Sequence, residues 1–68
     1  MRELAIRDDM IRLGQALKLA GLAASGGEAR ALIEQGAIGV NGEVERRRGR
    51  QLHPGDVVTL GDDAVRIA

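Results

Sequence analysis

A chain of 68 residues without a single cysteine has to hold its fold together by packing alone, because neither a disulfide nor a thiolate-bound metal can support it. So short a chain predicts one domain, spanning residues 1–68, with one modest hydrophobic core. No apolar run is long enough to cross a bilayer, and the amino terminus shows no secretory pattern. We therefore expect a cytoplasmic protein without a membrane partner.

Two short helices are predicted between residues 13 and 36. The first follows the i, i+3, i+4, i+7 spacing of a single helix face, with apolar residues at Leu13, Ala16, Leu17 and Ala20. The second begins with Ser25 and Glu28, which have the spacing of a capping box, in which each side chain satisfies the other residue's free backbone amide. Its predicted buried stripe consists of Ala29, Leu32 and Ile33. Gly21 and Gly36 are placed to end the two helices.

The remaining apolar residues alternate with polar ones, as they do in half-buried strands. The alternating pairs are Leu4 and Ile6, Ile38 and Val40, Val58 and Leu60, and Val65 and Ile67. Asn41-Gly42 predicts a hairpin. A two-residue loop would leave Val44 on the outer face, so we expect a bulge or a longer loop that turns it inward. The pattern predicts an α+β fold, with two short helices packed on one face of a small, mostly antiparallel sheet.

The formal net charge is zero, but the basic residues are concentrated in the middle of the chain. Residues 12–50 carry seven basic and four acidic side chains, whereas the segments on both sides carry more acids than bases. Because salt screens charges over about 10 Å, a polyanion would respond to this local excess more than to the net charge.

The densest part of this basic region is Arg46-Arg47-Arg48-Gly49-Arg50. Guanidinium groups stay charged and can donate to two phosphate oxygens at once. The alternative interpretation is a solvated loop that keeps a strand edge from aggregating. Because four adjacent like charges repel one another, and mixed signs would serve solubility equally well, we expect an anion-binding surface here that is continuous with the helices.

The helices supply further candidate anion ligands. Arg12 and Lys18 fall on the polar side of the first predicted helix, and Arg30 lies near the start of the second. Taken singly, each is also explained as an ordinary surface charge. Ser25 is expected mainly as a cap, but Gly26 leaves the helix start open, and exposed amides there could receive a phosphate.

Catalysis, a metal site and a cofactor are not expected. The single histidine, His53, adjoins Pro54 in a turn-like segment and is interpreted as a solvated loop residue. The chain has no nucleophile–histidine–carboxylate set, no cluster of metal ligands, and no phosphate-loop or dinucleotide-binding fingerprint.

From Leu13 to Leu60 the chain resembles the S-four RNA-binding domain, the module named after small-subunit ribosomal protein four. The residues that carry the resemblance are Leu13, Leu17, Gly21, Ser25, Ala29, Arg30, Leu32, Ile33, Gly36, Ile38, Val40, Asn41, Gly42, Gly55 and Asp56. The added terminal strands make it similar to the small, free-standing YbcJ-like members. The resemblance implies the alpha-L motif and RNA contacts from Lys18, Ser25, Gly26 and Arg30, extended by the segment from Arg46 to Arg50.

Two positions depart from the pattern of that family. Many members have an arginine directly after the serine that begins the second helix, where this chain has Gly26. Many also have an acid after the leucine that opens the first helix, where this chain has Gly14.

The expected function is binding of structured or double-helical RNA, with ribosomal RNA among the candidates, by a monomeric bacterial protein. The chain has no Phe, Tyr or Trp on which bases of a single strand could stack, which favours recognition of shape and phosphate. Two alternatives use the same scaffold: a protein-interaction module that docks on an acidic partner, and an accessory subunit of an RNA-modifying enzyme.

Overall fold

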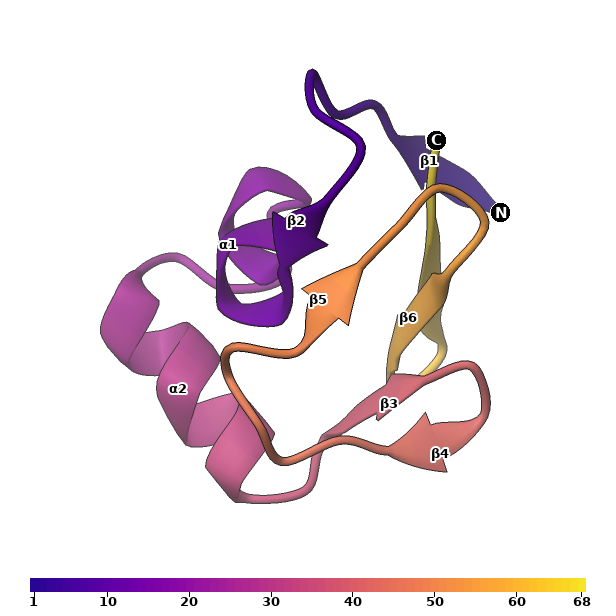
Figure 1. The fold of residues 1–68 in the computed structure, drawn as a ribbon. Coiled ribbons are helices and arrows are strands. Elements are labelled where there is room, and N and C mark those ends of the chain that lie inside the picture. The colour runs from indigo at the N-terminus through magenta and orange to yellow at the C-terminus, as the bar shows by residue number, and fades with distance from the viewer.

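The computed structural model describes all 68 residues, which form two helices beside two sheets (Figure 1). In chain order the elements are β1 (Arg2–Leu4), β2 (Ile11–Arg12), α1 (Leu13–Leu19), α2 (Gly26–Glu34), β3 (Ile38–Val40), β4 (Glu43–Val44), β5 (Gln51–Leu52), β6 (Val57–Leu60) and β7 (Asp63–Ile67). The larger sheet has the order β1-β7-β6-β3-β4, and β2 pairs with β5 in a separate antiparallel ribbon. Neither helix has the length and hydropathy that a membrane span requires.

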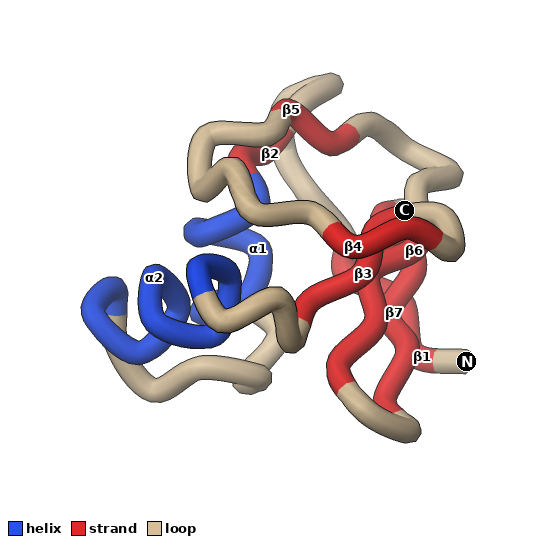
Figure 2. The backbone as a smooth tube through the Cα atoms, turned by 90° about the horizontal axis from the view of Figure 1, so that it is seen from below, coloured by secondary structure: helices blue, strands red, loops and turns tan.

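The helices lie to one side of the five-stranded sheet, and the β2–β5 ribbon closes the space between them (Figure 2). Only the pairing of β1 with β7 is parallel; all other strand pairs are antiparallel. The predicted α+β architecture, with two helices on a mostly antiparallel sheet, is therefore confirmed.

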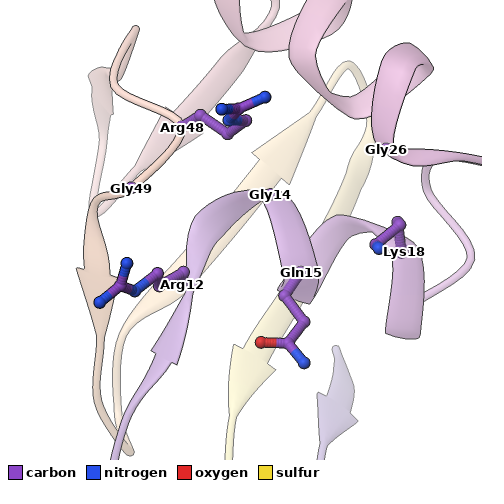
Figure 3. A pocket seen from close by; sticks show the side chains of 7 residues that line it. All are labelled: Arg12, Gly14, Gln15, Lys18, Gly26, Arg48 and Gly49. Carbon is purple, nitrogen blue, oxygen red and sulfur yellow. The ribbon is translucent and has the colours of Figure 1, made fainter.

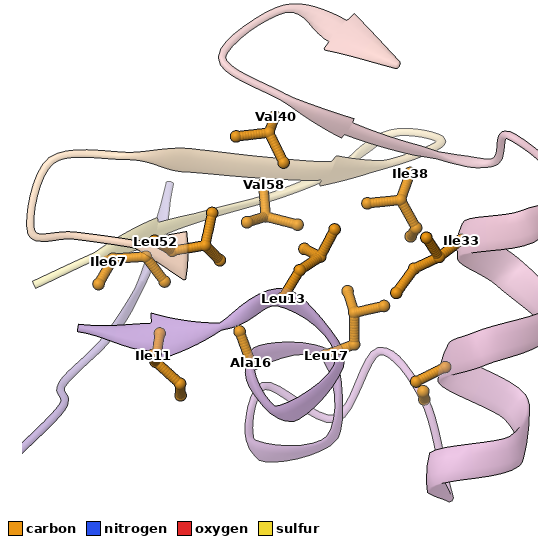
Figure 4. Packing of buried hydrophobic residues seen from close by; sticks show 12 residues of the cluster. Ile11, Leu13, Ala16, Leu17, Ile33, Ile38, Val40, Leu52, Val58 and Ile67 are labelled. Atoms are coloured by element: carbon orange, nitrogen blue, oxygen red, sulfur yellow. The ribbon is translucent and has the colours of Figure 1, made fainter. Parts of the chain in front are cut away.

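An aliphatic cluster of 12 buried residues fills the space between the helices and the strands (Figure 4). Leu13 and Leu17 of α1 meet Ile33 of α2 and Ile38 of β3 at its centre, and all four are fully buried. Since apolar burial contributes about 25 cal/mol per Å² removed from water, this cluster is the main stabilising element of a chain without disulfides.

Both helices end as predicted, in left-handed glycines. Gly21 has φ +75° and Gly36 has φ +77°, and both follow a helix whose last carbonyls accept the hydrogen bonds of a Schellman motif. At the start of α2, the Ser25 Oγ accepts from the Glu28 amide at 3.1 Å. The reciprocal bond differs from the prediction, because the Glu28 carboxylate accepts from the amide of Ala24 instead of that of Ser25.

The expected bulge after the Asn41-Gly42 turn is wrong. Both turn residues have positive φ, +52° and +88°, and the two-residue loop pairs Val40 directly with Glu43. Val44 therefore points outward and is 61% exposed. Glu45 takes the inward position instead: its amide donates to the Ile38 carbonyl at 3.0 Å, and the residue is only 8% exposed.

Two further elements differ from the predictions. Arg12 does not belong to the first helix but to β2, which pairs with β5 and leads directly into α1. The amino-terminal strand ends at Leu4, and Ile6 packs half-buried against the core after the strand has ended. Strands of two residues such as β2 and β5 are too short to show alternation in a sequence.

The hairpin register can be tested with two matched valine substitutions. Val40→Ala removes buried methyl groups beside β6 and should lower the free energy of unfolding by about 2 kcal/mol. Val44→Ala removes the same groups from an exposed position and should change it by less than about 0.5 kcal/mol. Urea unfolding followed by circular dichroism measures both, and equal losses would mean that Val44 is buried.

Candidate nucleic-acid interface

The loop between β4 and β5 is attached by its backbone to the beginning of α1. The amide of Leu13 donates to the Arg50 carbonyl at 2.9 Å, and the amide of Gly14 donates to the Arg48 carbonyl at 3.1 Å. The N-cap residue, Arg12, makes no capping hydrogen bond with its side chain. The loop carbonyls therefore satisfy two of the amides that the start of a helix leaves free, and the helix in turn fixes the position of the loop.

Gly14 permits this close approach. A Cβ atom at this position would lie 2.9 Å from the Cγ of Arg48, which is closer than side-chain carbons pack. The glycine that weakens the helix by its flexibility is thus the residue that lets the arginine-rich loop lie against the helix.

The four arginines of the loop point to three different places. Arg46 extends to the end of α2, where its Nη1 donates to the Glu34 carbonyl at 3.4 Å. Arg47 and Arg50 form ion pairs with Glu45, at 3.2 and 2.6 Å. Arg48 makes no ion pair and no side-chain hydrogen bond, and its side chain crosses Gly14 toward the helices (Figure 3).

Glu45, an almost buried carboxylate, directly precedes the arginine run. It accepts hydrogen bonds from the amide, Nε and Nη2 of Arg47 and from Nη1 of Arg50. These bonds, those of Arg47 first, lower the pKa of Glu45 to about 2. At neutral pH the carboxylate is therefore charged, and it offsets one of the two positive charges that it holds together.

A groove opens between the start of α1, the start of α2 and the arginine-rich loop. The residues that line it are Arg12, Gly14, Gln15, Lys18, Gly26, Arg48 and Gly49 (Figure 3). We call this the cationic groove, because three of these residues are basic and none is acidic. Its three basic side chains form no ion pair with any carboxylate of the chain.

The start of α2 adds backbone donors to the cationic groove. The amides of Gly26 and Gly27 have no hydrogen-bond partner, whereas those of Glu28 and Ala29 are satisfied by Ser25. No atom lies within 4 Å of where a Cβ of Gly26 would be, so this end of the helix is open. Lys18 extends into the same space from α1 (Figure 3). The arrangement suits an anion.

The cationic groove gathers four of the nine predicted ligand residues: Arg12, Lys18, Gly26 and Arg48. Ser25 is engaged as the cap of α2, and Arg30 pairs with Glu34 at 3.0 Å on the exposed side of that helix. The other three predicted ligands, Arg46, Arg47 and Arg50, are held by the partners described above. The expected continuous surface is therefore divided.

Sequence reasoning did not identify Gly14, Gln15 and Gly49 as lining residues. Of these only Gly14 gave a signal, because a glycine in the first turn of a helix has a cost that a close contact can explain. No three His, Cys, Asp or Glu side chains are grouped so that they could hold a metal ion.

Comparisons with known proteins agree with this architecture. A family model described as the S4 domain matches residues 4–68. The chain is 46% identical over 57 residues to a Bacillus subtilis protein named probable ribosome maturation protein RlbA, a match that covers 84% of this chain and 80% of that protein. It is 44% identical over 54 residues to the small ribosomal subunit protein uS4m of Schizosaccharomyces pombe, covering 79% of this chain but 16% of that protein.

Two more matches extend the comparison. A tyrosine–tRNA ligase of Moorella thermoacetica is 43% identical over an alignment of 63 positions that covers 81% of this chain and 15% of the ligase. The crystal structure of the 30S ribosomal protein S4e from Thermoplasma acidophilum superimposes with a TM-score of 0.66 at 20% identity, covering 88% of this chain and 32% of that one. At that identity the likeness concerns the fold alone.

The ion pairs of Glu45 predict how stability depends on pH. Because the folded state lowers its pKa to about 2, the unfolded chain takes up a proton first, and the free energy of unfolding should fall as the pH drops from about 4.5 to about 2. In Glu45→Gln this part of the loss should disappear, and stability at neutral pH should be lower. Urea unfolding across this pH range measures both effects.

The matched control is Glu43→Gln, two residues away, because Glu43 is exposed and unpaired. Its pH profile should follow that of the unsubstituted protein. If Glu45→Gln showed the same acid-induced loss as Glu43→Gln, Glu45 would not be charged and paired in the folded state.

Proposed function

This chain belongs to the S4 domain family, and we propose that it binds structured or double-helical RNA, ribosomal RNA above all, without catalysing a reaction. The cationic groove carries the proposal: Arg12, Lys18 and Arg48 line one space, and no acidic residue lines it with them. Relatives named as a ribosome maturation protein and as a ribosomal subunit protein support ribosomal RNA as the ligand.

The chemistry of the groove fits the phosphate backbone. The guanidinium groups offer paired donors to phosphate oxygens, Lys18 adds a mobile point charge, and the free amides of Gly26 and Gly27 add donors in fixed positions. The backbone that carries these groups is held in place: β2 with Arg12 pairs with β5, and the loop with Arg48 is hydrogen-bonded to the start of α1, the helix that carries Lys18. Only the three basic side chains then have to be ordered when RNA binds.

The preference for duplex or folded RNA over a single strand rests on the absence of Phe, Tyr and Trp from the chain. Without them the chain lacks the large aromatic surfaces on which single-strand binders most often stack splayed bases, which favours a duplex or folded RNA as the ligand. A duplex or folded RNA presents phosphates in a fixed geometry that a rigid cationic groove can match. We propose that the protein acts as a monomer in the bacterial cytoplasm.

The proposal predicts a small but measurable dependence on salt. Neutralising three phosphates should give a slope of about −3 in a plot of log affinity against log salt concentration. Each of Arg12→Gln, Lys18→Gln and Arg48→Gln should weaken binding of a short RNA duplex about tenfold and reduce the slope by about one. Fluorescence anisotropy at several salt concentrations measures both quantities.

Arg66→Gln is the matched control, since it removes the same charge from β7, where Arg66 pairs with Glu3. It should change the affinity less than about twofold, because an exposed pair outside the groove is worth little. An Arg48→Gln protein that binds the duplex as tightly as Arg66→Gln would contradict the assignment of the groove.

A further inference from the structure

A second hollow lies on the far side of Gly49 from the cationic groove. It is lined by Arg47, Gly49, Arg50, Gln51, His53 and Asp56. The two hollows share Gly49 and no other residue, so the arginine-rich loop forms a wall between them. Along that wall the arginines divide, with Arg48 on one side and Arg47 and Arg50 on the other. We call this second space the balanced hollow, for its charge.

The charges around the balanced hollow cancel. Arg47 and Arg50 are opposed by Glu45, which holds both, and by Asp56. The carboxylate of Asp56 accepts from the Asn41 Nδ2 at 3.0 Å and from the His53 amide at 2.8 Å, and these bonds lower its pKa, so it is charged at neutral pH. Asp56 lines the hollow, and Glu45 does not line it but pairs with both arginines, so two negative charges offset the two positive ones. The cationic groove, in contrast, is lined by three basic residues, none of which pairs with an acid. A phosphate would therefore be attracted to the cationic groove and only weakly to the balanced hollow.

The balanced hollow is nevertheless rich in groups that form hydrogen bonds. The side chains of Gln51 and His53 are on exposed residues and have no partner in the structure. Arg47 and Arg50 keep N–H groups that Glu45 does not use. Donors and acceptors thus lie close together without excess charge, which suits a neutral hydroxyl that both donates and accepts.

We propose that the balanced hollow receives ribose 2′-hydroxyl groups of the same duplex whose phosphates lie in the cationic groove. The shallow minor groove of an A-form helix displays these hydroxyls beside its phosphates, and they are what distinguishes RNA from DNA at a protein surface. The arginine-rich loop would place a phosphate site on one side and a hydroxyl site on the other, as phosphates and 2′-hydroxyls lie side by side in the minor groove of the duplex. The inference rests on the proposed function and assigns Gln51 and His53 as its specificity-determining residues.

The test compares an RNA duplex with a 2′-fluoro duplex of the same sequence, which keeps the A-form helix but cannot donate from the 2′ position. The unsubstituted protein should bind the RNA about fivefold more tightly, the value of about one neutral hydrogen bond. In the double variant Gln51→Ala and His53→Ala, RNA affinity should fall about fivefold to the level of the fluoro duplex. The salt dependence should stay unchanged, because the double variant keeps Arg12, Lys18 and Arg48, the basic residues that line the cationic groove.

Gln35→Ala, at the opposite end of α2 from the cationic groove, controls for the loss of an exposed amide and should leave the preference intact. Arg48→Gln should weaken both duplexes equally. If Arg48→Gln weakened both but the double variant kept the preference for RNA, or if the unsubstituted protein showed no preference, the hydroxyl site would be refuted. If Arg48→Gln had no effect on either duplex, the proposed function itself would fail.

Discussion

Two hydrogen bonds from the start of α1 to the carbonyls of Arg48 and Arg50 fix the position of the arginine-rich loop against that helix. They give a seven-residue helix the capping that its own N-cap side chain does not supply, and they hold a loop of like charges in one position. Everything proposed for the surface depends on that attachment, because it determines which side of the loop each arginine faces. A loop free in solution would present all four guanidinium groups to any polyanion without discrimination.

Glu45 makes such a concentration of arginines compatible with a stable fold. Four adjacent cations in a loop repel one another, and a buried carboxylate that binds two of them removes much of that repulsion. Arg46 is drawn away to the end of α2, where the carbonyl ends of a helix favour positive charge. Arg48 is thus the one member of the run whose side chain makes neither an ion pair nor a hydrogen bond within the chain, which has no net charge to attract polyanions over a distance.

The sequence predicted the α+β architecture correctly, and the details that it predicted correctly within that architecture are local ones. Ser25 as a cap, and the glycines after both helices, each express the geometry of a few consecutive residues. The inward turn of Val44 was wrong because apolar character alone was taken to decide burial. Glu45 is buried in its place through partners further along the chain, and those pairings are invisible to alternation patterns. For the same reason the arginine run was recognisable as a signal, while its division among Glu34, Glu45 and the groove was not.

The two departures from the family pattern are linked by this geometry. An acid at position 14 would collide with the side chain of Arg48 and would also offset its charge, so the glycine there serves both sterics and electrostatics. At position 26 the glycine leaves the free amides of Gly26 and Gly27 without a side chain beside them at the start of α2. Compared with the family pattern, this chain lacks the acid at position 14 and the arginine at position 26. The two absences cancel, so the net charge of the groove is the same. In the proposed anion site, the loop then supplies the cation from a backbone bonded to α1, and the free amides of Gly26 and Gly27 take the place of one flexible side chain.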